Sequence, residues 1–253
     1  MNVNKIKSMK AKEKIAVLTA YDYNLANIMD NIVDLVLVGD SLGMVVLGYD
    51  STKQVTMQDM IRHTQAVAKG AKKSPIVADL PYQSDKTEED AIKNAKLLIK
   101  AGASAVKPEG KLNIVKALVK ENIPVMAHIG LLPQTAESYS VQGKDEETAD
   151  KLIQEAKAFE KAGAFAIVLE SIPYKLANTI TESVSIPTIG IGAGPYCDGQ
   201  VLVSYDMLGL YDKFKPKFAR QYVDLREIIK EAIINYKDDI KKKKFPTKRE
   251  SYE

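Results

Sequence analysis

The chain has 253 residues, of which 45% are hydrophobic and 27% are charged, and its formal net charge at pH 7 is +3. This length suits one (β/α)₈ barrel of about 250 residues, and no apolar stretch approaches the roughly 20 residues of a membrane span. Because no signal-peptide core follows the basic amino terminus and Cys197 is the only cysteine, we expect a cytoplasmic protein with no membrane partner and no internal disulfide.

Much of the positive charge lies in the carboxyl-terminal segment KKKKFPTKR, which spans Lys241–Arg249. Charge runs of this kind often form solvated ends. A nucleic-acid interface would instead place basic and aromatic side chains together on a folded face, and the chain has no Trp. We therefore expect no nucleic-acid partner, and one catalytic domain over residues 1–253 with a basic flexible tail from about residue 243.

Short apolar runs without polar alternation are typical of strands that are covered on both faces. Eight runs fit this description: Lys14–Thr19, Leu35–Gly39, Ile76–Ala78, Ala105–Lys107, Pro124–Ala127, Phe165–Leu169, Pro187–Gly190 and Gln200–Tyr205. Amphipathic stretches with helical spacing separate most of them: Tyr23–Asn31, Thr56–Lys72, Thr87–Lys100, Lys111–Lys120, Glu146–Lys161 and Ile172–Glu182. This alternation predicts an α/β fold with a parallel sheet, the (β/α)₈ TIM barrel.

Two parts of the chain depart from a regular barrel. The connection between the last two predicted strands is too short for a full helix, so we expect an irregular barrel there. The stretch Phe218–Lys242 is charged and amphipathic, which predicts an extra helix beyond the barrel. Such a helix packs on the outside of the barrel or on another subunit.

Several of the apolar runs end on ionisable residues, which are costly inside a core. These residues are Asp40, Asp79, Lys107 with Glu109, His128, Glu170 and Asp206. In a parallel barrel the carboxyl ends of all strands meet at one mouth. The sequence therefore predicts that acids far apart along the chain surround one metal and one substrate.

A short internal repeat supports this arrangement. The segments KAGASAVKPEG, Lys100–Gly110, and KAGAFAIVLES, Lys161–Ser171, both run from a helix end through glycine to a strand and a glutamate. Glycine just past a helix end adopts the left-handed conformation at little cost. We expect the two units to deliver Glu109 and Glu170 to equivalent heights.

Asp40 and Asp79 carry the carboxylate oxygens that Mg²⁺ prefers, usually one or two with water or substrate oxygens beside them. Each aspartate alone is equally well explained as a helix cap or as the partner of a lysine. Ser41 and Gly43 follow Asp40 in a turn that offers a hydroxyl and backbone N–H groups to an anion.

Several segments together resemble the ketopantoate hydroxymethyltransferase family. They are LTAYDY (Leu18–Tyr23), LVGDSLGMVVLGYDST (Leu37–Thr52), VADLPY (Val77–Tyr82), VKPEG (Val106–Gly110), HIGLLPQ (His128–Gln134), VQGK (Val141–Lys144), AGAFAIVLES (Ala162–Ser171) and IPTIGIGAGPYCDGQVLV (Ile186–Val203). The resemblance implies a (β/α)₈ barrel, a homo-oligomer and the formation of ketopantoate, on the route to pantothenate and coenzyme A, from 3-methyl-2-oxobutanoate and 5,10-methylenetetrahydrofolate.

The resemblance also implies roles for individual residues. Asp40 and Asp79 match Mg²⁺ ligands, and Glu109 matches a glutamate that supports the metal directly or through water. Glu170 matches the general base that removes the proton beside the ketone. In the remaining part of the site, Ser41 matches a residue that holds the substrate carboxylate, and Lys107 matches one that binds the oxo acid or the product.

Some positions depart from the family pattern or stay open. Pro108 replaces the usual Leu between Lys107 and Glu109, and because proline fixes φ, we expect it to affect the direction of these two side chains. Ala136–Ser140 replaces a segment that is more often glycine-rich, and we expect this change to affect the closure of the loop after His128. His128 is either a substrate-side hydrogen-bonding group or a structural histidine.

Two other reactive side chains favour a structural reading. His63, within a predicted helix, is structural or interfacial, and Cys197 is a packing residue without a basic neighbour.

Two rival functions fit parts of the sequence. The glycine-rich run Gly190–Gly194 resembles a phosphate cradle, which favours a phosphosugar isomerase or a phosphoenolpyruvate-type mutase or lyase. A barrel kept only as a scaffold is the other alternative, but Asp40, Asp79, Glu109 and Glu170 are all present.

Overall fold

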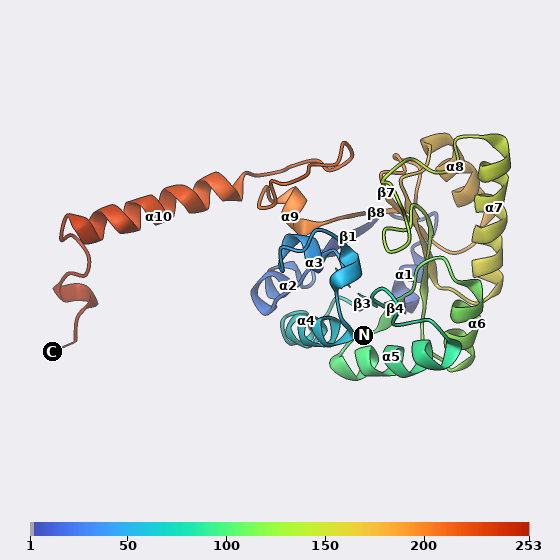
Figure 1. Cartoon of the computed structure of the whole chain (residues 1–253), viewed down its shortest axis with the longest axis horizontal. Helices are drawn as coiled ribbons and strands as arrows, with labels where there is room; N and C mark the ends of the chain where they lie inside the picture. The colour runs from blue at the N-terminus through green and yellow to red at the C-terminus, as the bar shows by residue number, and fades with distance from the viewer. Residues whose placement is uncertain (1–2, 253) are drawn as a thin grey trace. The chain divides into compact units, whose positions relative to one another are not determined.

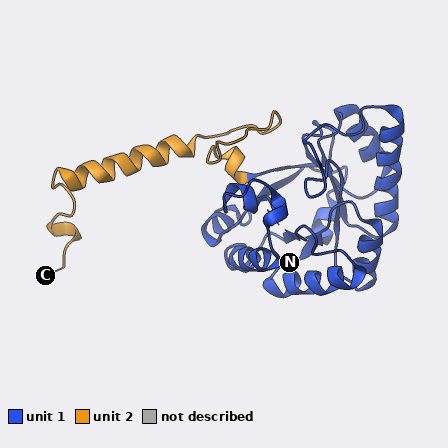
Figure 2. Cartoon of the chain, in the orientation of Figure 1, with its two compact units in different colours: residues 1–203 blue, residues 204–253 orange. Residues whose placement is uncertain are grey.

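The computed structural model describes residues 3–252 of the chain. The chain divides into two units, residues 1–203 and residues 204–253, which Figure 2 shows in blue and orange. Each unit is described by itself below. The expectation of a single catalytic domain over the whole chain stays a prediction.

The first unit contains one sheet of eight parallel strands (Figure 1). The strands are β1 (Ile15–Thr19), β2 (Leu35–Val38), β3 (Ile76–Asp79), β4 (Ala105–Lys107), β5 (Met126–Gly130), β6 (Ala166–Glu170), β7 (Thr188–Ile191) and β8 (Gly199–Leu202). Their order is β4-β3-β2-β1-β8-β7-β6-β5, so β1 pairs with β8 and the sheet curls into a nearly closed barrel. The predicted (β/α)₈ fold is confirmed.

The barrel has a seam between β4 and β5, which form the two ends of the strand order. One isolated parallel bridge, Val106 to Val125, crosses this seam. The Val106 N–H donates to the Pro124 carbonyl over 3.1 Å. The two strands at the seam therefore share fewer paired residues than the other neighbouring strands. Contacts outside the strands help to hold the two sides of the seam together.

The barrel core consists of apolar side chains from the strands, among them Val17, Leu35, Val77 and Val168. A short helix, α1 (Asn4–Ser8), contributes Ile6 to the same cluster. The sequence did not predict α1, because five residues are too few to show helical spacing.

Helices cover the outside of the strands, as α4 to α8 show in Figure 1. The first unit contains α2 (Tyr23–Met29), α3 (Leu42–Val45), α4 (Met57–Gly70), α5 (Glu88–Ala101), α6 (Leu112–Lys120), α7 (Glu146–Lys161), α8 (Tyr174–Ser183) and the 3₁₀ helix η1 (Thr52–Gln54). The predicted helix α7 has the observed bounds, because Asp145 caps it by accepting a hydrogen bond from the Thr148 N–H. Gly102 and Gly163 have φ values of 113° and 96°, as expected of glycines past helix ends.

Two strands differ most from the predicted bounds. Strand β5 begins two residues later than predicted, at Met126, and runs three residues further, to Gly130, so that His128 lies inside the strand. Strand β8 ends at Leu202, and Tyr205 and Asp206 belong to the helical turn α9 (Ser204–Met207). Between β7 and β8 no helix forms, which agrees with the short connection.

The second unit contains α9, α10 (Leu225–Lys241) and the 3₁₀ helix η2 (Lys248–Glu250). The predicted extra helix is confirmed as α10, although it begins seven residues later than Phe218, at Leu225, where Asp224 caps it. The helices formed by residues 3–252 all lack the combination of length and apolar composition that crossing a membrane requires.

Candidate active site

Asp79 and Lys107 lie side by side because β3 and β4 pair in parallel with these two residues in register. The Lys107 ammonium is 3.0 Å from Asp79 Oδ1, and both side chains are buried. Burial alone lowers the pKa of Lys107, but the charges of Asp79, Glu109 and Asp40 outweigh it and hold the pKa of Lys107 above its usual value. The lysine is therefore a permanent cation inside the barrel mouth.

Asp40 lies two residues after the end of β2 and meets Asp79 from the neighbouring strand. Its backbone N–H donates to Asp79 Oδ2 over 3.0 Å. Burial, and then the charge of Asp79, raises the pKa of Asp40 to about 7. Without a bound metal the two buried carboxylates therefore repel each other.

Glu109 and Glu170 lie on opposite sides of the His128 ring. His128 Nε2 is 3.1 Å from Glu170 Oε2, and His128 Nδ1 is 3.7 Å from Glu109 Oε1. Burial and the nearby Lys107 lower the pKa of His128, so its imidazole is neutral at neutral pH. Burial also raises the pKa of Glu109 well above its usual value. The internal repeat thus brings the two glutamates to one histidine.

Gly130, the last residue of β5, makes room for the general-base candidate. It has a φ of 94°, and a Cβ atom at this position would lie 2.2 Å from the Glu170 carbonyl oxygen. The Leu131 N–H donates to the same carbonyl over 2.9 Å. Glycine at 130 therefore lets the ends of β5 and β6 approach closely, which fixes the backbone that carries Glu170.

Ser41 also reaches this region. Its hydroxyl is 2.9 Å from the Tyr21 hydroxyl, and Tyr21 is buried. The Tyr21 carbonyl in turn contacts His63 Nδ1, which agrees with the structural reading of His63. The sequence analysis assigned no role to Tyr21, since a tyrosine after an apolar run resembles any core residue.

Gln134 is the second residue that the sequence analysis missed. It is buried in the segment after β5, and its side-chain amide donates to Asp40 Oδ2 over 2.8 Å. Its backbone N–H donates to Glu109 Oε2 over 3.1 Å. A neutral side chain in an irregular segment carries no charge signal, so only its place in HIGLLPQ pointed to this residue.

The position of Pro108 does not turn its neighbours away from the mouth. Lys107 pairs with Asp79 before it, and Glu109 contacts Gln134 and His128 after it. The departure from the family pattern at this position is therefore compatible with the same arrangement of charged groups.

The charged groups of this cluster can be compared with the ligands that Mg²⁺ prefers. It contains four carboxyl groups against one ammonium, and Asp79 Oδ1 is buried without an aligned hydrogen bond. Within residues 3–252 no group of three or more His, Cys, Asp or Glu side chains is arranged to hold a metal. Mg²⁺ takes one or two carboxylates and fills its other positions with water and substrate, so Asp40 and Asp79 fit this ion.

Three further positions from the sequence analysis belong to other elements. Asp206 is in α9, in the second unit, where burial raises its pKa to about 6. Cys197 is buried, and burial raises the pKa of its thiol, as expected of a packing residue. The Gly194 carbonyl accepts from Gln200 Nε2 over 2.8 Å, and a Cβ at Gly194 would meet Tyr174. Close packing thus accounts for this glycine.

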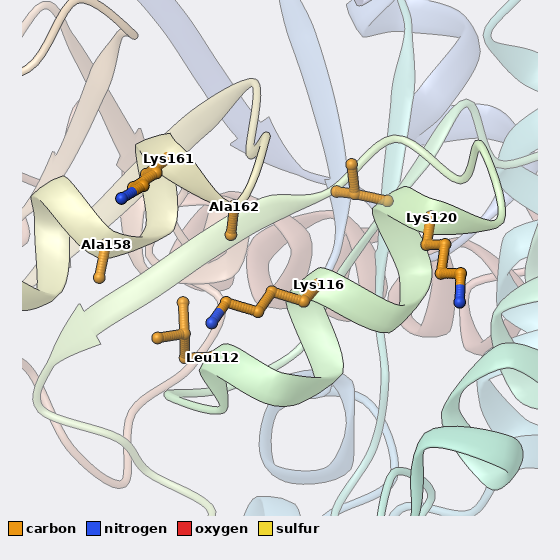
Figure 3. Close-up of a pocket in the computed structure, with 7 residues that line it drawn as sticks. Leu112, Lys116, Lys120, Ala158, Lys161 and Ala162 are labelled. Carbon is orange, nitrogen blue, oxygen red and sulfur yellow. The ribbon is translucent and has the colours of Figure 1, made fainter.

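A surface cavity between α6 and α7 contains none of the predicted site residues (Figure 3). Its lining consists of Leu112, Lys116, Val119, Lys120, Ala158, Lys161 and Ala162. The lining includes no acid and no nucleophile beside its lysines, so we do not assign the chemistry to it.

Comparisons with known proteins agree with the resemblance seen in the sequence. A family model described as ketopantoate hydroxymethyltransferase matches residues 1–248. A 3-methyl-2-oxobutanoate hydroxymethyltransferase from Caldicellulosiruptor saccharolyticus is 54% identical over 248 residues, which cover 95% of this chain and 94% of that protein. A protein of the same name from Caldivirga maquilingensis is 53% identical over 246 residues, or 94% of this chain and 92% of its own. The resemblance found in the sequence is confirmed.

Solved structures that resemble this chain share its fold at low sequence identity. A phosphoenolpyruvate phosphomutase from Streptomyces platensis subsp. rosaceus has a TM-score of 0.66 and 12% identity, and the match covers 96% of this chain and 88% of that one. A phosphonopyruvate hydrolase in complex with oxalate and Mg²⁺ has a TM-score of 0.63 and 14% identity, with 80% and 81% covered. These likenesses support the barrel alone.

Proposed function

This chain belongs to the ketopantoate hydroxymethyltransferase family, and from that premise we propose that it forms ketopantoate from 3-methyl-2-oxobutanoate and 5,10-methylenetetrahydrofolate. One observation carries the proposal. Two chains of contacts, Asp40 to Asp79 to Lys107 and Glu109 to His128 to Glu170, lie at the same barrel mouth. The first can bind an oxo acid with a metal, and the second can remove a proton.

Asp40 and Asp79 would hold Mg²⁺, and Glu109 would support it through water. When bound there, Mg²⁺ supplies Lewis-acid stabilisation of the developing enolate charge, a contribution worth several kcal/mol. Lys107 adds a fixed positive charge 3.0 Å from Asp79. This ammonium attracts the anionic oxo acid or the product, while the Ser41 hydroxyl is suited to donate to the substrate carboxylate.

Glu170 is the proposed base for the proton beside the ketone. It is the last residue of β6, and its side chain is 17% exposed, in contrast to the more deeply buried His128 with 2%. The carboxylate therefore reaches toward the place where substrate enters. Neutral His128, whose Nε2 is 3.1 Å from Glu170 Oε2 without an aligned hydrogen bond, lies directly beside that carboxylate.

The reaction balances with these groups and one water molecule. Water adds to the methylene carbon of the folate, both carbon–nitrogen bonds of that carbon break, and tetrahydrofolate leaves with the two water protons, so that the one-carbon unit is at the level of formaldehyde. Glu170 takes the proton from the carbon beside the ketone, the resulting enolate forms a carbon–carbon bond to the one-carbon unit, and the proton on Glu170 passes to the new alkoxide. A base positioned in this way typically contributes about 10²–10⁴-fold to the rate.

The direct test is ketopantoate formation by the purified protein, followed by NMR with Mg²⁺, the oxo acid and the folate donor. We expect product only when all three are present, and EDTA abolishes it. Absence of product from the complete mixture would contradict the proposed function. Turnover of a phosphorylated oxo acid in its place would favour the mutase or lyase alternative.

A further inference from the structure

The side chain of Gln134 binds the carboxylate region of the site through two donated hydrogen bonds. Its Nε2 donates to Asp40 Oδ2 over 2.8 Å and to the Leu80 carbonyl over 2.9 Å. Both partners accept hydrogen bonds, so the nitrogen of the amide, and not its oxygen, faces them. Both N–H groups of the amide are used, and the side chain is held in one orientation.

These two bonds set the spacing of the two aspartates. Leu80 directly follows Asp79 in the chain, and the Asp40 N–H already donates to Asp79 Oδ2. The amide of Gln134 therefore ties the Asp40 side chain to the backbone beside Asp79. It occupies Oδ2 of Asp40, while Asp79 Oδ1 keeps no aligned hydrogen bond.

Gln134 also spans the seam of the barrel. It follows β5, which lies at one end of the strand order, and it binds groups that follow β2, β3 and β4 at the other end. Few ladder contacts cross this seam. The bonds of this one buried residue, which is 3% exposed, thus connect the two sides of the mouth.

We propose that Gln134 is a positioning residue that holds the Asp40 carboxylate beside Asp79, so that the two can bind one divalent cation. This inference rests on the proposed function only in taking the cation to be Mg²⁺. The residue does not touch the reacting atoms; it acts through Asp40.

The test is Mg²⁺ binding to the metal-stripped full chain without substrate, measured by titration calorimetry for wild type and for Gln134→Met. Methionine keeps the length of the side chain and the backbone N–H bond to Glu109, and it removes both amide bonds. We expect Mg²⁺ affinity to fall about 10–100-fold, the usual loss when a residue that orients a metal ligand is removed. The matched control is Gln154→Met, at an exposed position of α7, with wild-type affinity.

The outcomes separate positioning from general stability. Wild-type Mg²⁺ affinity in Gln134→Met, even with a lower thermal midpoint, would overturn the proposal. Should this variant not fold, Gln134→Asn, whose shorter amide cannot reach both acceptors, is expected to lose affinity in the same direction, and wild-type affinity in it would overturn the proposal equally.

The proposed function can fail independently. If the wild type binds Mg²⁺ and Gln134→Met does not, but neither forms ketopantoate, the positioning role stands and the proposed reaction is wrong. If the wild type forms ketopantoate but binds no Mg²⁺, the positioning role is wrong.

Discussion

Asp40 and Asp79 are the residues whose removal most directly tests the metal site. We expect Asp40→Asn and Asp79→Asn each to fold and to lose about 100-fold or more of Mg²⁺-dependent turnover, since Lewis-acid stabilisation is worth several kcal/mol. The rate of ketopantoate formation measures the loss of turnover, and calorimetric titration with Mg²⁺ measures the metal affinity. Asp150→Asn, at an exposed position of α7, is the control. A folded variant with wild-type metal affinity would exclude that aspartate as a ligand.

Glu170 is expected to separate proton removal from substrate binding. Glu170→Gln keeps the shape of the side chain and is expected to lower exchange of the substrate proton with deuterated water by about 10²–10⁴-fold. The exchange is followed by NMR with Mg²⁺ and no folate, which isolates this step from the later carbon–carbon bond. Glu147→Gln, on the exposed surface of α7, serves as control. Wild-type exchange in Glu170→Gln would shift the base to another group.

The burial of Asp40, together with the charge of Asp79, makes the stability of the metal-free protein depend on pH. Burial and Asp79 raise the pKa of Asp40 to about 7, above its value of about 3.9 in an unfolded chain. Between these values the folded chain binds more protons than the unfolded chain, so the free energy of unfolding falls as pH rises from about 4 to 7.

Urea unfolding in EDTA measures this dependence. We expect the decrease to be smaller in Asp40→Asn, in which the titrating group is absent, and Mg²⁺ is expected to restore stability to the wild type above pH 7. The same pH dependence in variant and wild type would show that Asp40 is not its source.

At the scale of the elements, the close approach of β5 and β6 requires glycine at position 130. Gly130→Ala places a Cβ 2.2 Å from the Glu170 carbonyl, whereas a Cβ at Gly48, with a φ of 74°, meets no atom within 4 Å. We expect Gly48→Ala to cost about 1–2 kcal/mol for the left-handed backbone alone, and Gly130→Ala about 1–3 kcal/mol more for overpacking. Urea unfolding compares them, and equal losses would mean that the crowding is relieved elsewhere.

The alternation of apolar runs and amphipathic stretches was enough to predict the barrel, because buried parallel strands leave a clear pattern. The same reliance on apolar residues made the predicted bounds of β5 wrong. The polar His128 was taken as the first residue after the strand, but β5 pairs with β6 as far as Gly130, and the His128 ring is buried between two glutamates. The helix α3 was missed because Ser41 and Gly43 are typical of turns.

The charged members of the candidate site were visible in the sequence because each follows an apolar run. Gln134 was not visible in this way, since its role comes from hydrogen bonds to residues 54 and 94 positions away. Such contacts depend on the order of the strands around the barrel. The sequence of the segment around Gln134 gives no information about that order.

At the scale of the whole molecule, the exposed apolar residues of α10 indicate that the chain forms a homo-oligomer. No residue of α10 is buried, and Ile229, Ile233, Tyr236 and Ile240 form an apolar stripe at helical spacing on it. We expect a homo-oligomer by light scattering at micromolar concentration, because a stripe of this kind is stabilised by burial against another surface.

The matched variants lie on the same helix. Ile229→Lys with Ile233→Lys is expected to reduce the molecular mass, whereas Ile234→Lys, which 3.6 residues per turn place on the far side of α10, leaves it unchanged. A monomeric wild type would reject the assembly, and an unchanged mass in the double variant would move the interface away from α10.

The seam also has a consequence for the connectivity of the chain. The strands that are neighbours in sequence, β4 and β5, share one bridge, whereas β1 and β8, near opposite ends of the first unit, pair over four residues. Bringing β1 and β8 together closes a long loop of chain, which costs conformational entropy. The strand pair that carries this cost is therefore the one with more paired residues. A break in the chain between β4 and β5 leaves a sheet of eight connected strands, but loss of β1 leaves the two parts of the sheet joined only by the bridge between Val106 and Val125.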